Sequence, residues 1–393
     1  MQSPRFDVVE FISQGCYSVV YKAISTQGSD MTTSYAMKRF FLQKSTAVRC
    51  ALREHHILVR LALHRQQSPF LPTLFYSFRI HGSPTFVMRR GSGLDLFALA
   101  CHLKHVPEND ARFYSCEIIC GLQCLHAMHI VHLDLKPENI LLSDSGHVFI
   151  TDFDRSYDAS ERRGPPNACD FHATPHFMAP EIANRLEITT KADVWSLALL
   201  MAEIVSGPVR PGDSDGTEDM RWARLGRYRI RNANNLSKSL RDFFKSCLKL
   251  NYKARPDIVG VKNLKFYCNV DWHKVASCTV RPPYLPSQLT LRKASNDFVG
   301  DRRDPLLLEA AYGKEMPLVD CKLHYKLGED STRQLVTVPP NSVELAKAGF
   351  TPNKIKELFA SFDFTNPILL PHDGVCVTSA VSHVDELLTH LEE

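Results

Sequence analysis

The segment HLDLKPENILL (132–142) carries a carboxylate, an ammonium and an amide at close intervals. Asp134 could accept the proton of a hydroxyl, Lys136 could reach a phosphate that is being transferred, and Asn139 could ligate a metal ion. Thirteen residues after Asn139, Asp152 ends an apolar run and could hold a metal that bridges phosphates. These residue types at this spacing indicate phosphoryl transfer, in which charge is neutralised and an acceptor hydroxyl is oriented.

Two charged residues upstream fit the same chemistry. Lys38 lies in YAMK, within a strand-like run, where its ammonium could contact the α- and β-phosphates of a nucleotide. Glu54 lies in a helical pattern over 46–64 and is the expected ion-pair partner of Lys38. Taken alone, Lys38 would be interpreted as a solvated strand lysine and Asp152 as a strand-end carboxylate. Their occurrence in one ordered set favours chemistry.

The elements that position these residues change in character along the chain. The first part is rich in β-branched and aromatic runs, and two of them form a strand pair joined by the turn Gly82-Ser83-Pro84. Beyond Gly93 the pattern is mainly helical: Asn109 or Asp110 could cap one helix, and another runs from Asp193 to Gly207. After about Trp272, proline-punctuated segments predict a tail that is ordered by contact rather than a second core.

The order Lys38, Glu54, Asp134, Asn139, Asp152 and MAPE (178–181) resembles the protein kinase family over roughly residues 6–267. The resemblance implies an α+β, bilobal fold with a β-rich N-lobe (6–90) and a mainly helical C-lobe (91–272). It also implies an enzyme that uses ATP and Mg²⁺ to phosphorylate protein hydroxyls. Lys136 and ATPHF (173–177), whose Thr174 is similar to a threonine behind the catalytic aspartate, resemble the serine/threonine class.

The resemblance assigns further roles by position. Asp193 is similar to the aspartate that braces the catalytic loop, and Arg255 to the arginine that pairs with the glutamate of MAPE, here Glu181. The residues that resemble nucleotide contacts are Ile12, Gly15, Val20, Ala36, Lys38, Glu54, Met88, Asp95 and Leu141, with Arg89 beside Met88 in the hinge wall. Glu138 and Glu203 resemble acceptors of basic substrate side chains, so we expect Arg or Lys near the phosphorylation site; both are otherwise ordinary helix or surface acids.

The tail (273–393) indicates the AGC group. FYCNVDWHKVASCTVRPPYLPS (266–287) resembles the segment that follows the catalytic domain in AGC kinases, and LFASFDFTNP (358–367) resembles their hydrophobic motif, here 359–364. The resemblance implies that Phe359, Phe362 and Phe364 dock in the N-lobe beside the helix that carries Glu54. The other interpretation is an amphipathic helix end. Phe298 is a further candidate for a contact near the nucleotide, and equally a plain loop aromatic.

Several positions depart from the family pattern. The phosphate-covering loop ISQGCYSVV (12–20) keeps only Gly15 of three glycines, which predicts weaker or slower nucleotide binding. Leu133 replaces the arginine that gathers an activation-loop phosphate. Acidic or apolar residues replace the usual phosphorylation sites: Asp170, Asp363 and, beside Thr337, Val338. We expect Asp170 to be a solvated loop acid and Asp363 to be the better phosphate mimic.

These departures predict a kinase that is not gated by phosphorylation at these places and is either always assembled or controlled by a protein partner. Asp154, in ITDFDRS (150–156), replaces a hinge glycine but removes no catalytic group. The alternative function is a pseudokinase that acts as a scaffold or allosteric regulator of another kinase. The complete set of catalytic side chains opposes that alternative.

Composition limits the remaining classes. The 393 residues have a net charge of +4, which argues against a strongly basic nucleic-acid binder. There is no signal-like start and no long uncharged apolar run, so we expect no membrane span and a cytoplasmic or nuclear protein. Cys116, Cys120 and Cys124 recur every four residues along one predicted helix face. They are interpreted as small buried apolar residues; the alternative is a set of metal-binding or redox-active thiols.

Overall fold

In the computed structural model the chain divides into two compact units, which are described separately. Unit 1 comprises residues 1–65, 73–90 and 291–393, and unit 2 comprises 66–72 and 91–290. The structure describes residues 6–15, 17–80, 82–160, 166–212, 216–289, 324–327, 331–334 and 342–369. Phe298, Thr337 and Val338, which the sequence singles out, lie outside the described residues.

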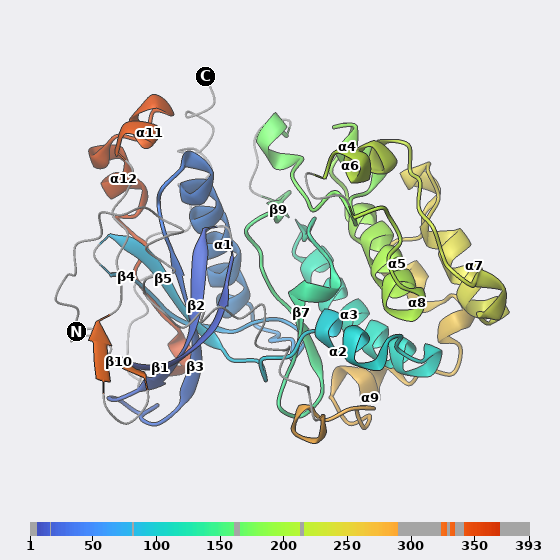
Figure 1. Ribbon diagram of the computed structural model, residues 1–393, viewed down its shortest axis with the longest axis horizontal. Helices are drawn as coiled ribbons and strands as arrows, with labels where there is room; N and C mark the ends of the chain where they lie inside the picture. The colour runs from blue at the N-terminus through green and yellow to red at the C-terminus, as the bar shows by residue number, and fades with distance from the viewer. Residues whose placement is uncertain are drawn as a thin grey trace. The chain divides into compact units, whose positions relative to one another are not determined.

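Unit 1 is built on a sheet with strand order β11-β10-β1-β2-β3-β5-β4-β12 among the described residues. Helix α1 lies against this sheet beside β4 (Figure 1). Its elements are β1 (Phe6–Gln14), β2 (Ser18–Ser25), β3 (Ser34–Phe40), α1 (Ser45–Leu63), β4 (Leu74–Ile80), β5 (Ser83–Arg89), β10 (His324–Leu327), β11 (Ser331–Gln334), α11 (Ser342–Lys347), α12 (Pro352–Leu358) and β12 (Phe364–Thr365).

The register of the central strands sorts their residues onto two faces. Val20 pairs with Lys38, Lys38 with Phe86, and Ala36 with Met88, so these side chains share one face. Intervening residues, including Val19, Tyr21, Tyr35, Met37 and Val87, form a buried apolar cluster on the other face. Because side chains alternate between the two faces, one face of the sheet packs in an apolar cluster, and the other carries the predicted nucleotide-contacting residues Val20, Ala36, Lys38 and Met88.

The tail adds strands at both edges of the unit 1 sheet. β10 pairs in parallel with β1, and β12 pairs with β4 through Phe364–Ser77 and Thr365–Tyr76. The Asn366 amide group donates to the Leu74 carbonyl at 2.7 Å, and the Asn366 N–H donates to Phe75. The prediction of a tail ordered by contact is confirmed for this segment.

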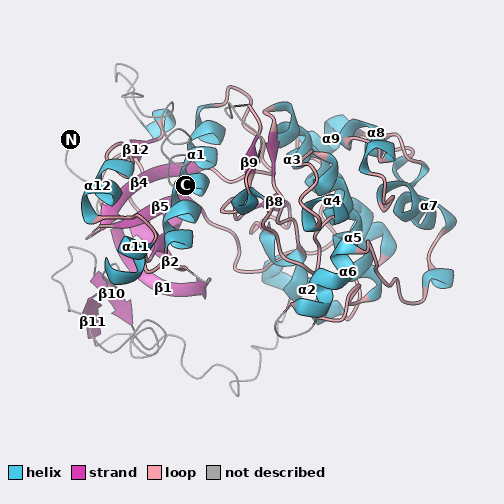
Figure 2. Cartoon of the chain, turned by 90° about the horizontal axis from the view of Figure 1, so that it is seen from above, coloured by secondary structure: helices cyan, strands magenta, loops and turns pink. Residues whose placement is uncertain are grey.

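Unit 2 is mostly helical, with two short antiparallel strand pairs, β6–β9 and β7–β8 (Figure 2). Helix α3 packs against α5, α8, α9 and β8 and so forms its core. The elements are α2 (Leu96–Leu103), α3 (Glu108–Ala127), β6 (Ile130–Val131), η1 (Pro137–Asn139), β7 (Ile140–Leu142), β8 (Val148–Ile150), β9 (Tyr157–Asp158), η2 (Ala168–Asp170), α4 (Pro180–Ala183), α5 (Lys191–Ser206), α6 (Thr217–Arg224), α7 (Lys238–Cys247), α8 (Ile258–Lys262) and α9 (Trp272–Ala276). The α+β prediction is confirmed by the sheet of unit 1 and the helices of unit 2.

The observed bounds of helices and strands differ from the sequence-based predictions in three places. α3 begins at Glu108 after Pro107, so the prediction of Asn109 or Asp110 as its cap is wrong; both lie inside the helix. α5 begins at Lys191, before Asp193, and ends as predicted at Gly207, whose φ of +85° suits a glycine. Ser83 and Pro84 belong to β5 rather than to the predicted turn.

The three periodic cysteines lie on α3. Cys116 is buried, and burial raises the pKa of its thiol to about 12; burial likewise raises the pKa of Cys120 to about 11. Neutral thiols are weak metal ligands and nucleophiles. Within the described ranges no cluster of three or more His, Cys, Asp or Glu could hold a metal ion. The structure therefore favours the packing interpretation of these cysteines.

Candidate active site

In unit 1, Lys38 and Glu54 form a buried ion pair. Lys38 is on β3, and its ammonium donates to both carboxylate oxygens of Glu54, on α1, at 2.9 and 2.7 Å. The side chains are 10% and 2% exposed, so water competes little with this contact. The predicted pairing of these two residues is confirmed. It fixes α1 against β3 and holds the Lys38 ammonium on the sheet face that also carries Val20 and Ala36.

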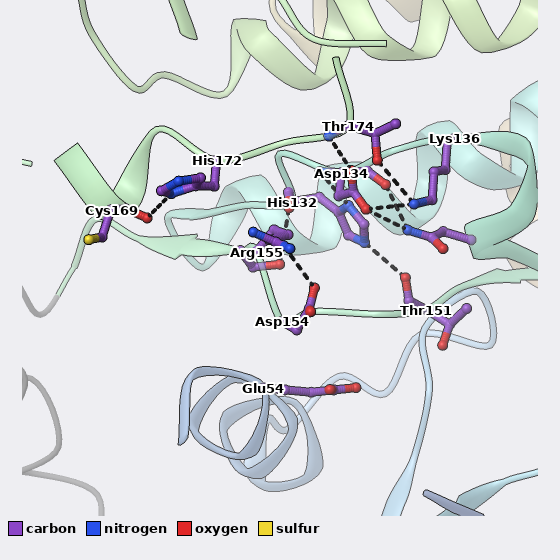
Figure 3. A network of polar contacts seen from close by, with 12 residues as sticks. Glu54, His132, Asp134, Lys136, Thr151, Asp154, Arg155, Cys169, His172 and Thr174 are labelled. Carbon is purple, nitrogen blue, oxygen red and sulfur yellow. Dashed lines mark hydrogen bonds and ion pairs between the residues drawn. The ribbon is translucent and has the colours of Figure 1, made fainter. Parts of the chain in front are cut away.

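In unit 2, Asp134 is the centre of a polar network (Figure 3). The Thr174 N–H donates to one oxygen of its carboxylate at 2.8 Å, and the Lys136 ammonium lies 3.0 Å from the other. The Asn139 amide donates to the Asp134 carbonyl at 2.8 Å and to its carboxylate at 3.2 Å. Lys136 also donates to the Thr174 hydroxyl at 3.1 Å, so Thr174 lies behind Asp134 as predicted.

The network keeps Asp134 ionised. Burial alone would raise the pKa of Asp134, but the Lys136 ammonium and the hydrogen bonds from Thr174 outweigh burial and lower it to about 2. Burial would also lower the pKa of Lys136, and the Asp134 carboxylate outweighs this and raises it. A carboxylate fixed in this way can orient a hydroxyl and accept its hydrogen bond, while the ammonium beside it can balance negative charge on a phosphate.

The backbone before Asp134 is held by the Asp193 carboxylate. Its two oxygens accept the N–H groups of His132 and Leu133, each at 2.9 Å, and His126 Nε2 lies 2.8 Å away. Leu133 has a φ of +65°, which is unfavourable for a non-glycine residue, and these two hydrogen bonds offset that cost. The predicted bracing role of Asp193 is confirmed. Leu133 itself is 3% exposed and apolar, so it offers no cation to a phosphate.

Asn139 and Asp152 are the residues that could hold Mg²⁺. Both hydrogen bonds of the Asn139 side chain use its nitrogen, which leaves Oδ1 as the atom suited to a metal. Asp152 has a φ of +68° and lies close enough to Lys136 to raise the pKa of that lysine. One amide oxygen and one carboxylate fit Mg²⁺, which is usually bound by few protein oxygens and completed by water and substrate phosphates.

The predicted nucleotide-contacting residues divide between the units. In unit 1, Val20 and Ala36 are half-buried and Met88 is buried, all on the face that carries Lys38, whereas Ile12 and Gly15 are exposed. In unit 2, Asp95 and Leu141 form an isolated backbone bridge and are half-buried. The Asp95 carboxylate accepts the Ala98 N–H at 2.7 Å and caps α2, and burial raises its pKa.

Asp154 does not need the conformation that only glycine adopts readily. Its φ is not positive, whereas that of Asp152, two residues earlier, is. Asp154 Oδ1 lies 3.7 Å from Arg155 Nε, and both side chains are partly exposed (Figure 3). The substitution of a hinge glycine by aspartate is therefore accommodated in this structure without backbone strain at residue 154.

The prediction that Asp170 is a solvated loop acid is wrong. Asp170 is 1% exposed, and its carboxylate accepts the Asn167 N–H at 2.9 Å while the Asn167 side chain accepts the Cys169 N–H at 3.0 Å. This reciprocal capping box closes the η2 turn. The spacing Asn167-x-x-Asp170 is the sequence signal of this capping box.

The hydrophobic motif lies on unit 1. Phe359 and Phe362 are buried, and the Phe362 ring stacks on His55 of α1 at 4.2 Å between centroids and on Phe86 at 5.5 Å. Phe364 is half-buried in β12. Phe362 therefore docks beside α1, the helix that carries Glu54, as the sequence predicts. Asp363 is exposed, and within the described residues its carboxylate has no hydrogen bond or ion pair.

Sequence reasoning missed two residues that hold this motif. The Ser77 hydroxyl donates to the Phe362 carbonyl at 2.7 Å, so it must accept from His55 Nε2, 2.9 Å away. These contacts place a proton on His55 Nε2. Burial, followed by the neighbouring His56, lowers the pKa of His55 to about 3, so the ring is neutral near pH 7. The sequence signal for His55 is its position directly after Glu54, on the helix where the motif is expected to dock.

The two predicted substrate acids differ in their surroundings. Glu138 is exposed, and burial of part of its side chain raises its pKa. Glu203, on α5, is half-buried, and its carboxylate lies 2.8 Å from His176 Nε2. His176, which the sequence reasoning passed over inside ATPHF (173–177), also places Nδ1 2.8 Å from Asp219.

A buried ion pair stabilises the segment after Thr174. Arg255 donates to both oxygens of Glu181 at 2.6 Å, and both side chains are almost fully buried. The guanidinium also lies over the Trp195 ring, 4.9 Å from its centroid. The predicted pairing of Arg255 with Glu181 is confirmed.

Comparison with known proteins agrees with this geometry. The model of the family described as "Protein kinase domain" matches residues 6–267. Ribosomal protein S6 kinase alpha-2 of Mus musculus is 34% identical over 292 residues, covering 72% of this chain and 38% of the relative. Ribosomal protein S6 kinase alpha-3 of Homo sapiens is 33% identical over 291 residues, and alpha-6 of Danio rerio 33% over 294, each with 72% of this chain and 38% of the relative covered.

The chain belongs to the protein kinase family, and it is an AGC-like member of the serine/threonine class. The aligned part spans 38% of the length of the curated relatives. No helix within the described residues is both long and apolar enough to cross a membrane.

Proposed function

We propose that this protein transfers the γ-phosphate of ATP to serine or threonine hydroxyls of protein substrates. The observation that carries the proposal is the Asp134 network, in which a buried, ionised carboxylate is held by Lys136, Thr174 and Asn139. Asp134 would orient the acceptor hydroxyl, and Lys136 would stabilise negative charge on the transferring group. Lys38, held by Glu54, would contact the nucleotide phosphates.

Asn139 Oδ1 and the Asp152 carboxylate would hold Mg²⁺, which neutralises phosphate charge when it is bound. Val20, Ala36 and Met88 would contact the adenine from unit 1, with Ile12 and Gly15 in the phosphate-covering loop. Asp95 and Leu141 would contribute from unit 2. Exposed Glu138 is available to a basic side chain of a substrate.

We also propose that phosphorylation at the activation segment and hydrophobic motif is not required. Three features support this: Leu133 is buried and apolar, Asp170 closes its own turn, and Phe362 is docked beside an unmodified Asp363. Control by a protein partner and a cytoplasmic or nuclear location are further parts of the proposal. The described cysteines are free thiols, which supports a reducing compartment.

The test is transfer of radiolabel from MgATP to a degenerate Ser/Thr peptide library. Wild type is compared with Asp134→Asn, which keeps the size of the side chain and removes its charge, and with Lys38→Met. We expect wild type to exceed Asp134→Asn by about 100-fold or more, the usual contribution of a positioned base. No transfer above that background, together with no thermal shift by MgATP, would favour the pseudokinase alternative.

A further inference from the structure

His176 lies between two carboxylates that come from different helices. Its Nε2 is 2.8 Å from Glu203 of α5, and its Nδ1 is 2.8 Å from Asp219 of α6. Ionised carboxylates only accept hydrogen bonds, so both ring nitrogens must donate, and an imidazole with two N–H groups is the cation. Burial would lower the pKa of His176, but Glu203 and then Asp219 outweigh burial and raise it.

A second cation, Arg210, lies near the His176 segment. The Arg210 guanidinium donates to the carbonyls of Pro175 and, at 3.0 Å, Met178, on either side of His176. Arg210 also interacts electrostatically with Asp219, whose other oxygen accepts the Gly212 N–H at 3.0 Å. Among the described residues, the His176 imidazolium therefore lies against the carboxylates of Glu203 and Asp219, and the Arg210 guanidinium interacts with Asp219 as well. The Glu203 side chain is only 14% exposed, and one of its oxygens is committed to the imidazolium.

We propose that His176 is a specificity-determining residue that occupies, as an internal cation, the Glu203 carboxylate to which a basic substrate side chain would otherwise bind. The inference rests on the proposed phosphotransferase function and refines its substrate class. The preferred substrate has a neutral residue at the position that faces Glu203. A basic residue contributes only where it meets a different acid, such as the exposed Glu138.

The physical reason is the cost of displacing His176. An arginine from a substrate would have to displace a charge-assisted hydrogen bond and leave an imidazolium partly buried with one partner fewer. The arginine gains one charge-assisted hydrogen bond to Glu203, and His176 loses one. The enzyme therefore discriminates little between arginine and a neutral residue at this position. A neutral His176 can donate to only one of the two carboxylates and brings no positive charge, and when His176 is absent Glu203 is a partly buried carboxylate without that partner. In both cases an arginine becomes more favourable.

The test measures kcat/KM for peptide pairs with Arg or Gln at each position upstream of the phosphorylated residue. Wild type, His176→Gln, Glu203→Gln and the double variant are compared at pH 7. We expect the Arg/Gln ratio in wild type to stay within about twofold at the position facing Glu203, and His176→Gln to raise it about tenfold or more at one position. The gain should disappear in His176→Gln/Glu203→Gln.

A pH profile of the same ratio separates specificity from a structural role and remains informative if His176→Gln folds poorly. As pH rises through the raised pKa of His176 the imidazolium loses its proton, so the ratio in wild type should rise, and in His176→Gln it should be flat. Asp219→Asn removes one of the two negative charges that raise the pKa of His176 and should move the rise to lower pH. The other charged groups near these residues in the described part of the chain are Arg210, whose pKa burial lowers to about 10, and Glu138, whose pKa burial raises.

The outcomes of these experiments are distinguishable. If wild type transfers no phosphate above Asp134→Asn, the proposed function fails, and the inference fails with it. If wild type is active but already prefers arginine at that position, or if the ratio neither changes in His176→Gln nor varies with pH, the inference alone is overturned.

Discussion

The environments of single residues decide how the departures from the kinase pattern act. Asp134, Lys136 and Asn139 are held by mutual hydrogen bonds, whereas the altered residue Asp154 contacts Arg155 and Asp170 caps the η2 turn. Asp154 adopts an ordinary backbone conformation, and Asp170 serves as a cap. The altered residues therefore do not remove a group that contacts substrate or metal.

We predict that Asp154→Gly changes little. Because residue 154 does not use a positive φ, glycine gains no strain relief there, and it adds conformational freedom to the unfolded chain. The expected loss of unfolding free energy is below about 1 kcal/mol, with kcat within about threefold of wild type. Urea unfolding and steady-state kinetics measure both. A tenfold change in kcat in either direction would show that the aspartate tunes the hinge.

A second prediction separates a cap from a phosphate mimic at Asp170. Asp170→Ala should lose about 1 kcal/mol of unfolding free energy, because the partly buried Asn167 N–H loses its acceptor, whereas Asp170→Asn retains an acceptor oxygen and should lose less. Thermal unfolding and activity are measured on both variants. If negative charge at residue 170 mattered as a mimic, Asn would impair activity as much as Ala.

At the scale of elements, the docking of the hydrophobic motif depends on α1 and β4 together. His55 supplies a ring that stacks on Phe362, and Ser77 links that histidine to the Phe362 carbonyl. β12 then extends the sheet beside β4. The same helix holds Glu54 against Lys38, so the tail segment and the ion pair are anchored on one element.

The neutral state of His55 predicts a pH dependence of stability. Its folded pKa is lowered to about 3, so between pH 6.5 and 3 the unfolded chain binds a proton that the folded chain does not. This contribution to stability is complete above about pH 6.5 and is lost as pH falls below it, by at most about 1.4 kcal/mol per pH unit. His56, Ser77 and the Phe362 carbonyl are the polar groups that face His55.

Urea unfolding of wild type and His55→Phe between pH 4.5 and 7.5 checks this dependence. Phenylalanine keeps a ring against Phe362 and Phe86 but cannot titrate. We expect the wild type to lose more stability than the variant on acidification, with a difference approaching one bound proton. Parallel pH profiles for the two proteins would contradict the assignment.

At the scale of the whole molecule, sequence alone predicted the ordered motif set and the α+β class. It also predicted three pairings: Lys38 with Glu54, Arg255 with Glu181 and Thr174 with Asp134. Each pairing is part of the protein kinase pattern that the sequence resembles. It could not predict contacts made by tertiary packing between distant segments. Ser77 meets Phe362 across 285 residues, and His176 meets Glu203 and Asp219 through two helices.

Burial was the other quantity that the sequence did not reveal. Asp170 looked solvated because acids usually are, but a local capping box compensates for its desolvation. The same argument applies to His55, whose neutral form is held by one hydroxyl. For Asp170 the spacing Asn167-x-x-Asp170 carries a local capping signal, whereas Ser77, which contacts His55, comes from a different segment and has no such signal.

The most direct test of the account is the rate of phosphoryl transfer by the whole protein after phosphatase treatment, with phosphate removal verified by mass spectrometry. Because Leu133 reads no phosphate and the segment around Asp134 is held by internal contacts, we expect kcat to be unchanged and about 100-fold or more above that of Asp134→Asn. A collapse of the rate to the Asp134→Asn level after dephosphorylation would contradict the account.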